Sequence, residues 1–412
     1  MSSRYLAGAA VAALLLGAAV DASAQNTLRW ASQGDALTFD PHSQNEGPTN
    51  TANQQVYEPL IWRNADLEMQ PGLAVSWEAV EPTVWEFKLR EGVTFHDGTP
   101  FTADDVVFSF ERAQAETSDF GDYITSVESV EALDDMTVAI RTTAPNPILP
   151  NQLTELMMVS RAWAEANDVE TPQDFAGGEE NYAVRNANGT GAFTLTIREP
   201  DVRTVMEKNP DWWGLEEHPH NIDEIVYTPI ANAATRVAAL LSGEIDFLLD
   251  PPVQDLARIE STPGLKTIQT PQIRTIFFGL DVGSDDLRFS DGNPFQEPQV
   301  RQAMAQAINI EAIQDRVMRG LAEPAGIITS PGVHGFTEAL DERPAFDVEA
   351  AKALMAEAGY PDGFETTMHC PNDRYVNDEA ICQAVVGMLA QIGIEVNLVA
   401  QSKSIHFAEL QN

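Results

Sequence analysis

The stretch from Val84 to Ala113, VWEFKLREGVTFHDGTPFTADDVVFSFERA, most narrowly limits how this chain can fold. Apolar and polar residues alternate from Val84 to Arg90, which predicts a strand with one buried face. Val93–Phe95 is predicted as a second short strand. Asp97-Gly98 is a turn dipeptide, because glycine adopts positive φ at little cost and aspartate bonds its own backbone. The first half of the stretch is therefore predicted to form two short strands followed by a turn.

The charged residues of the same stretch have two interpretations. His96 stands beside Asp97 and near Asp104 and Asp105, and such a group could supply general acid and base catalysis. Thr102 and Asp105, however, have the spacing of a helix N-cap and its capping box, and both later aspartates would lie where the helix dipole favours negative charge. His96 is then left without a base or nucleophile nearby in sequence. The stretch is accordingly interpreted as structural.

The first 24 residues have the pattern of a secretory signal peptide. Arg4 lies in a short n-region, an apolar run extends from Leu6 to Val20, and Ala22-Ser23-Ala24 supplies the small residues for cleavage after Ala24. The run is short for a transmembrane helix, and no second long run follows. We expect an exported protein without membrane insertion, located in the periplasm of a Gram-negative cell.

The acidity of the chain limits its partners. Aspartate and glutamate number 63 and lysine and arginine 24, a formal net charge of −39 at pH 7. Such a surface repels nucleic acid and anionic lipid, so neither is expected as a partner. The acidic residues are scattered rather than grouped, which favours a surface suited to salty surroundings over a specific binding role.

Cys370 and Cys382 are the two cysteines of the chain. In an oxidising compartment they are candidates for a disulfide, but sequence alone does not place their Cβ atoms within reach, so two free thiols remain an alternative. Neither cysteine has a second cysteine or a histidine at zinc-finger spacing. We therefore expect no metal site and no cofactor.

The remainder of the chain alternates strand and helix patterns. A strand over Ile222–Ile230, a helix over Ala233–Leu241 and a strand over Ile245–Leu249 form a unit typical of an α/β domain. Similar patterns predict further elements: the strand Thr275–Leu280, the helices Pro298–Ile308 and Val348–Ala358, the strand Phe364–His369, the helix Asp378–Ile392 and the strand Ile394–Val399.

The segment LREGVTFHDGTPFTADDVVFSFERA, between its strand and its helix, resembles the hallmark segment of the bacterial extracellular solute-binding proteins, family 5. These are the oligopeptide-, dipeptide- and nickel-binding components of ABC importers. Other segments resemble the same family: FDPHSQNEGPTNTANQQVYEPLIW, MQPGLAVSWEAVEPTVWEFKLR, NGTGAFTLTIREPDVRTVMEKNPDWWG, EPQVRQAMAQAINIEAI, AKALMAEAGYPDGFE and NDEAICQAVVGMLAQIGIEVNL. The resemblance extends over essentially all of the chain after residue 24.

The resemblance implies an α/β fold of the periplasmic-binding-protein type, with two α/β lobes around a ligand cleft and an extra inserted domain. On this chain the first lobe would take residues 25–61 and 190–270, the insert 62–189 and the second lobe 271–412. Members of the family cross back to complete the first lobe. That part of the pattern is absent, so we expect a chain truncated at its C-terminus, with the second lobe and its closing strands incomplete.

The resemblance also implies a function. A ligand would be trapped by closure of the lobes and delivered to the membrane permease of an ABC importer. Short peptides are the expected ligand, with opines, sugar acids, glutathione-like peptides and metal or haem complexes as alternatives, and a monomer is expected. A periplasmic hydrolase is the competing class. No Gly-x-Ser-x-Gly or His-Glu-x-x-His motif is present, so no enzyme is expected.

Candidate ligand-binding residues lie in two loops that follow predicted strands. In the segment CPNDRYVNDE we expect Arg374 to pair with a ligand carboxylate, beside Asn372 and Tyr375. The alternative is that Arg374 pairs at the surface with one of the neighbouring aspartates. In the segment SQGDALTFD the candidates are Gln33 and Asp35. No carboxylate for a peptide amine is assigned.

Overall fold

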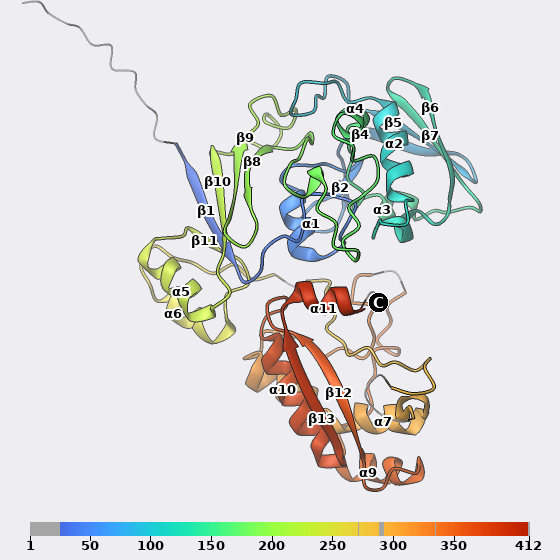
Figure 1. The fold of residues 1–412 in the computed structure, drawn as a ribbon, viewed down its shortest axis with the longest axis vertical. Coiled ribbons are helices and arrows are strands. Elements are labelled where there is room, and N and C mark those ends of the chain that lie inside the picture. Colours follow the sequence, from blue (N-terminus) through green and yellow to red (C-terminus); the bar gives the residue numbers. More distant parts are fainter. Residues whose placement is uncertain (1–24, 271, 288–291, 334, 411–412) are drawn as a thin grey trace, which may run out of the picture.

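A computed structural model of the chain describes residues 25–270, 272–287, 292–333 and 335–410 (Figure 1). The segment 1–24, interpreted above as a signal peptide, lies outside the described residues. We use lobe one for residues 25–61 and 190–270, insert for 62–189 and lobe two for 272–410. In Figure 1 lobe one and the insert form the upper body, and lobe two lies below them.

Lobe one is built on a five-stranded sheet in the order β11-β1-β10-β9-β8. The N-terminal strand β1 (Thr27–Ser32) lies between β10 (Glu224–Pro229) and β11 (Phe247–Leu248) and is parallel to both. β9 (Arg203–Lys208) and β8 (Phe193–Glu199) continue the sheet as an antiparallel hairpin. Its helices are α1 (Gly47–Asn53), α5 (Ala233–Ser242) and α6 (Leu256–Glu260).

The insert carries an antiparallel sheet in the order β4-β5-β7-β6 and a small two-stranded sheet, β2-β3. Its helix α2 begins at Ala103, after the capping box predicted from sequence: the Thr102 backbone N–H donates to Asp105 Oδ2 at 2.9 Å. The predicted strand Val93–Phe95 is wrong, because only an isolated bridge from Thr94 to Pro100 forms there. The elements are β2 (Ile61–Arg63), β3 (Met69–Pro71), β4 (Ala74–Glu81), β5 (Val84–Leu89), α2 (Ala103–Ala113), β6 (Val127–Asp134), β7 (Thr137–Thr142), α3 (Leu149–Gln152) and α4 (Arg161–Ala166).

Buried polar contacts join the insert to lobe one. His96 lies with Nε2 3.0 Å from the carbonyl oxygen of Gly191, and burial lowers its pKa, so the neutral ring is favoured. Within lobe one, the carboxylate of Glu58 accepts hydrogen bonds from the indole N–H groups of Trp212 and Trp213, both at 2.9 Å, and so joins the two parts of this lobe. His96 therefore has a structural role, in agreement with the interpretation of this stretch from sequence.

An ion pair with no solvent access lies at the centre of this junction. The guanidinium of Arg112 in α2 donates two hydrogen bonds to Asp40 of lobe one, at 2.7 and 2.6 Å, and the two side chains are 1% and 0% exposed. The backbone N–H of Gln173 donates to the same carboxylate at 2.9 Å. Asp40 thus fixes three segments that are far apart in sequence.

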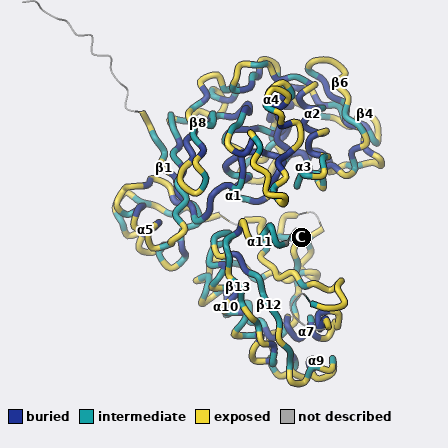
Figure 2. The backbone as a smooth tube through the Cα atoms, in the orientation of Figure 1, coloured by how far each residue is buried: buried dark blue, intermediate teal, exposed yellow. Residues whose placement is uncertain are grey.

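Lobe two is a second α/β body. β12 (Phe364–Pro371) and β13 (Ile394–Gln401) pair in parallel, and α10 (Asp378–Leu389) connects them. Their core includes residues of α7 (Pro298–Ala307) and α9 (Val348–Glu357). The short α8 (Ile310–Ala312) and the helix α11 (Lys403–Leu410) complete the described α-helices of this lobe. Figure 2 shows fewer buried residues here than around α1 and α2.

The predicted strand Thr275–Leu280 is wrong: no strand forms there. A strand needs a neighbour for its backbone hydrogen bonds, and in the described part of lobe two β12 and β13 pair only with each other. The β-branched and aromatic residues that suggested the strand are largely exposed, with Ile276, Phe277 and Phe278 at 44%, 61% and 36%. The residue pattern of this segment is typical of a strand, but a pattern within one segment does not show whether a neighbouring strand is present to accept its hydrogen bonds.

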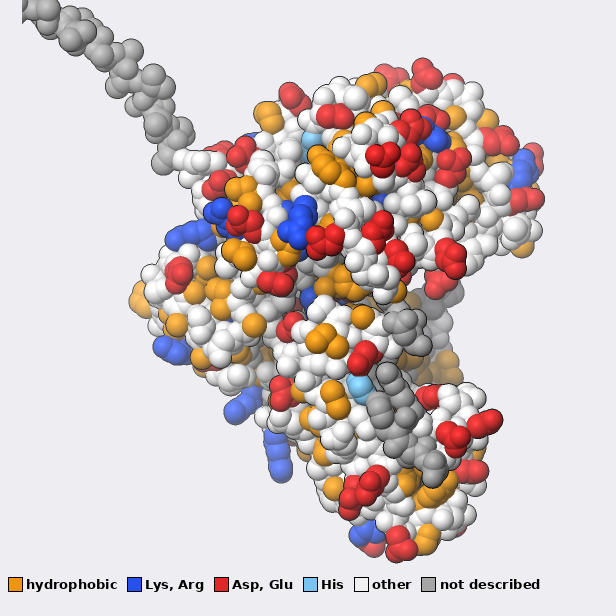
Figure 3. Space-filling view, viewed as in Figure 1, with side chains coloured by type: hydrophobic (Ala, Val, Ile, Leu, Met, Phe, Trp, Pro, Cys, Tyr) orange, Lys and Arg blue, Asp and Glu red, His pale blue; other side chains and the backbone are white. Residues whose placement is uncertain are grey.

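Acidic side chains are spread over both lobes on the face drawn in Figure 3 rather than gathered in one patch. Across the described residues, no helix has the length and apolarity needed to cross a bilayer.

Candidate functional site

The candidate site lies where the carboxyl ends of the parallel strands of two sheets face each other, one sheet in each lobe (Figure 1). From lobe one, Gln33 follows β1 and Asp250 follows β11, while from lobe two Arg374 follows β12 and Lys403 follows β13. Loops at the carboxyl ends of parallel strands are where open α/β sheets bind ligands. The arrangement therefore places two sets of ligand-facing loops against one another.

A pocket of about 100 Å³ opens between the two lobes at this edge. Lobe one supplies Gln33, Arg236, Asp250 and Gln254 to its wall, and lobe two supplies the start of α10. Asp250 has a φ of 52°, in the left-handed region that non-glycine residues rarely adopt. Such conformations recur at binding sites, where the surrounding structure holds the residue in place. Sequence reasoning missed Asp250, although its place after a predicted strand was a usable signal.

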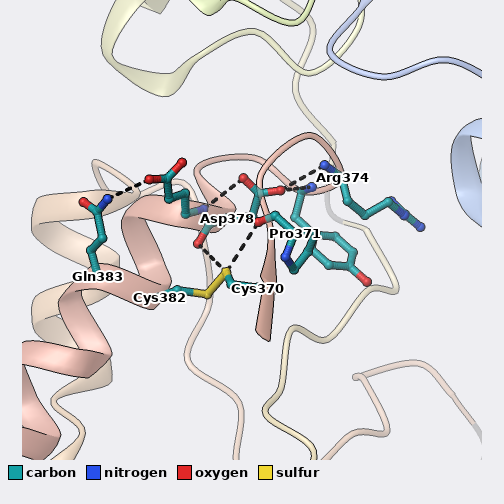
Figure 4. Close-up of a disulfide and its surroundings, with 8 residues drawn as sticks. Cys370, Pro371, Arg374, Asp378, Cys382 and Gln383 are labelled. Carbon is teal, nitrogen blue, oxygen red and sulfur yellow. Dashed lines mark hydrogen bonds between the residues drawn. A yellow bond between two sulfur atoms is a disulfide. The ribbon is translucent and has the colours of Figure 1, made fainter. Parts of the chain in front are cut away.

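The loop that carries Arg374 is held by the first residue of α10. Asp378 accepts hydrogen bonds from the backbone N–H groups of Arg374 and Tyr375 at 2.9 and 3.0 Å. The pKa of Asp378 is raised, because the effect of burial outweighs that of these backbone donors, which lower it. The side chain of Arg374 extends away from this carboxylate (Figure 4), over the ring of Tyr375 at 4.6 Å. Asp378 thus fixes the loop backbone and leaves the guanidinium for another partner.

That partner is Glu46, on the opposite lobe. Arg374 Nε lies 3.3 Å from Glu46 Oε2, and Lys403 Nζ lies 3.0 Å from Oε1. The Thr49 backbone N–H also donates to Oε1, at 2.9 Å. The three charged side chains are only 6%, 8% and 3% exposed for Glu46, Arg374 and Lys403. A buried, charged cluster therefore spans the cleft, and the alternative in which the Arg374 guanidinium pairs at the surface with a neighbouring aspartate is wrong.

Several atoms of this cluster have no hydrogen-bond partner among the described residues. Glu46 Oε2, Arg374 Nε and Arg374 Nη1 are all buried without one, because the 3.3 Å approach has ion-pair rather than hydrogen-bond geometry. Buried polar groups in folded proteins are nearly always paired, so such atoms call for an explanation. Together they offer one acceptor and two donors at the meeting point of the lobes.

The structure separates the two candidates of the first loop. Gln33 Nε2 donates to the carbonyl oxygen of Asn372 at 2.7 Å, so it reaches across the cleft. The carboxylate of Asp35 instead accepts from Arg198 at 2.6 Å and from the backbone N–H of Asp201 at 2.7 Å. Gln33, Asn372 and Arg374 are therefore brought together, while the Asp35 side chain is tied within lobe one.

Cys370 and Cys382 form a disulfide, with their sulfur atoms 1.99 Å apart (Figure 4). The bond ties the end of β12 to α10 and closes a loop that contains Arg374. Loop 371–377 is therefore anchored twice, by the disulfide and by the carboxylate of Asp378.

Replacing both cysteines with alanine should lower the free energy of unfolding by about 3 kcal/mol, the loop-closure contribution of a bridge over a dozen residues. Urea denaturation of the two proteins measures the difference. Adding a reductant should leave the unfolding of the double variant unchanged, which is the control. A double variant as stable as the wild type would mean that the bridge does not constrain this loop.

No group of three or more His, Cys, Asp or Glu side chains in the described ranges is placed to hold a metal ion.

Comparisons with known proteins agree on one family. The family profile "Bacterial extracellular solute-binding proteins, family 5 Middle" matches residues 68–411. Heme-binding protein A of Haemophilus influenzae is 28% identical over 405 residues, which cover 92% of this chain and 70% of that protein. Glutathione-binding protein GsiB of Escherichia coli strain K12 is 26% identical over 381 residues, which cover 91% of this chain and 69% of that protein.

Solved structures give the same result. The periplasmic binding protein DppA of Helicobacter pylori, in complex with the peptide STSA, superimposes with a TM-score of 0.77 at 25% identity, covering 92% of this chain and 74% of that one. The oligopeptide-binding protein AppA of Bacillus subtilis, in complex with a nonapeptide, shares the fold with a TM-score of 0.80 at 22% identity, covering 94% and 77%. The chain belongs to the bacterial extracellular solute-binding proteins, family 5.

Proposed function

We propose that this chain captures short peptides between its lobes and delivers them to the membrane permease of an ABC importer. The observation that carries the proposal is the interlobe cluster, in which Arg374 of lobe two has buried donors without a hydrogen-bond partner among the described residues. A peptide carboxylate is a matching acceptor, and hydrogen bonds from arginine to carboxylate are among the strong ones. A relative with 25% identity, DppA of Helicobacter pylori, was solved with the peptide STSA.

The two walls of the cleft suit a zwitterion. Arg374 supplies positive charge from lobe two, while Asp250 supplies negative charge from lobe one at the pocket. In this proposal Asp250 reads the peptide amine and Arg374 reads its carboxylate. Gln33 and the Asn372 carbonyl, already joined across the cleft at 2.7 Å, keep the lobes in register as they close.

Opines are the second candidate ligand. AgaA of Agrobacterium, solved in complex with agropinic acid, superimposes with a TM-score of 0.78 at 27% identity, covering 93% of this chain and 74% of that one. Opines also carry carboxylates, so the same cationic cluster suits them. The proposal further takes the protein to act by binding alone, as a monomer in the periplasm after loss of residues 1–24. Turnover of chromogenic esters or peptides by the purified chain would contradict it.

A thermal melt with di- to pentapeptides at millimolar concentration tests the ligand class. A peptide present at about 100 times its dissociation constant adds about 2.7 kcal/mol to stability, which raises the melting temperature by several degrees. We expect an upward shift with a subset of the peptides. A cooperative melt that moves with an opine such as agropinic acid but with no peptide would transfer the proposal to the second candidate.

A further inference from the structure

We infer that Arg274 is a specificity-determining residue of this cleft: with Arg374 it forms a pair of guanidinium groups that select ligands with a free carboxylate over otherwise identical neutral ones. The inference rests on the proposed function and deepens it. Arg274 was not among the candidates from sequence, because it does not follow a predicted strand: it directly precedes the predicted strand Thr275–Leu280, just after the crossing from lobe one to lobe two.

Both guanidinium groups meet over a single glycine. A Cβ atom placed on Gly47 would lie 3.1 Å from Arg274 Nη2 and 3.1 Å from Arg374 Nη2. The two nitrogens can therefore be separated by no more than twice that distance. A charge-assisted N–H···O bond is about 2.8 Å long, so one carboxylate can bridge nitrogens at this separation. Two positive groups so close together without an anion between them are unfavourable.

At Gly47 it is the lack of a side chain, rather than the backbone conformation, that lets the two guanidinium groups lie where they do. Its φ lies outside the left-handed region that favours glycine, and it occupies the first position of α1. Any side chain there would press on both guanidinium groups. The space above Gly47 is thus occupied by the ends of two arginines from lobe two, directly beside the carboxylate of Glu46.

The three cationic side chains of the cluster differ in how many hydrogen-bond and ion-pair partners they have. Lys403 donates to Glu46 and to the carbonyl oxygen of Asp35. Among the described residues the Arg374 guanidinium has the loose pairing with Glu46 and the contact with the Tyr375 ring, and its Nε and Nη1 donate no hydrogen bond. Arg274 forms no hydrogen bond or ion pair with any residue in the described ranges. Glu46 therefore pairs directly with Lys403 and Arg374, whereas Arg274 adds a positive charge that has no ion-pair partner among the described residues.

Electrostatics agrees with this geometry. Burial of its head group lowers the pKa of Arg274, and the neighbouring charge of Arg374 lowers it further, whereas Asp250 and Glu46 act in the opposite direction. The residue as a whole is exposed, so Arg274 can be replaced without opening a core. A ligand carboxylate placed between the two guanidinium groups would relieve their repulsion and satisfy the unpaired donors.

Calorimetric titration with alanine di-, tri- and tetrapeptides, each as the free acid and as the C-terminal amide, tests the inference. The wild-type chain should bind the free acids at least about tenfold more tightly, the value of one charge-assisted hydrogen bond. Arg274→Gln should weaken the acids by about tenfold and leave the amides unchanged. Gly47→Ala should weaken the acids too, because its Cβ displaces both guanidinium groups.

Arg316→Ala, which removes an exposed arginine elsewhere in lobe two, is the matched control and should bind like the wild type. If Arg274→Gln lost the same affinity for acids and amides, the inference would be overturned, because Arg274 would not recognise the carboxylate. It would also be overturned if the variant lost affinity for neither series. A wild-type chain that binds neither series would overturn the peptide proposal itself and this inference with it. Thermal melts of each variant establish that it is folded.

Discussion

Replacing Asp40 with asparagine should lower the free energy of unfolding by about 3–5 kcal/mol, the range for breaking a buried ion pair from one side. Arg112 is 1% exposed and would keep its charge with no carboxylate to balance it. The backbone N–H of Gln173 would also lose an anionic acceptor. Urea denaturation followed by tryptophan fluorescence measures the change.

An exposed pair of the same chemistry is the control. Arg203 and Glu199 lie 2.8 Å apart with about half of each side chain exposed, at 48% and 49%. Glu199→Gln should change stability by less than about 1 kcal/mol, because solvent screens such pairs. If Asp40→Asn cost no more than this, the junction between lobe one and the insert would not depend on the buried pair.

The same pair predicts how stability depends on pH. Burial by itself would raise the pKa of Asp40, but the charge and hydrogen bonds of Arg112 outweigh it, and the pKa is lowered. A carboxyl with a lowered folded-state pKa contributes stability that is present above its unfolded pKa, about 3.9, and is lost as pH falls through its folded value. The wild type should therefore lose this contribution in acid, and Asp40→Asn should show a shallower acid limb.

Replacing Arg374 with alanine should weaken binding of the tightest peptide by about 30-fold or more, since truncating one member of a buried charge pair costs about 2–5 kcal/mol. The ligand would lose its donors, and Glu46 would keep Lys403 and the backbone N–H and hydroxyl of Thr49 as partners. Calorimetric titration of wild type and variant with the same peptide gives the ratio.

Arg374→Lys separates charge from geometry. Lysine keeps the charge but lacks the planar fork of donors, so we expect it to recover only part of the affinity. A full recovery would show that Arg374 acts as a simple point charge. An Arg374→Ala variant that is folded and binds peptide as tightly as the wild type would remove Arg374 from the ligand site.

Local patterns predicted the local structure well. The capping box at Thr102 is confirmed by the hydrogen bond to Asp105, because both partners lie within one turn of the helix. The predicted elements Phe364–His369, Asp378–Ile392 and Ile394–Val399 correspond to β12, α10 and β13, with the ends shifted by a few residues. Such elements depend on residues close in sequence, and periodicity reports them directly.

Contacts between residues far apart in the chain were not predicted from the sequence. Glu46 and Lys403 meet across 357 positions, and neither was predicted for the site. Lys403 directly follows a strand that was predicted correctly, so the rule that found Arg374 applied to it as well. Glu46 had no comparable signal, since it follows no strand and serves locally as the N-cap of α1.

The time at which β1 can pair follows from its place in the sheet of lobe one, between two strands that lie much later in the sequence. Thr27 of β1 bonds to Glu224 of β10, 197 positions later. A ribosome that adds about 5–20 residues per second leaves roughly 10–40 s between these two strands. Throughout that interval the earliest strand of lobe one has no partner on either side. The first strand to be made is thus among the last to be paired, and molecules that bind unfolded chains can reach it during this time.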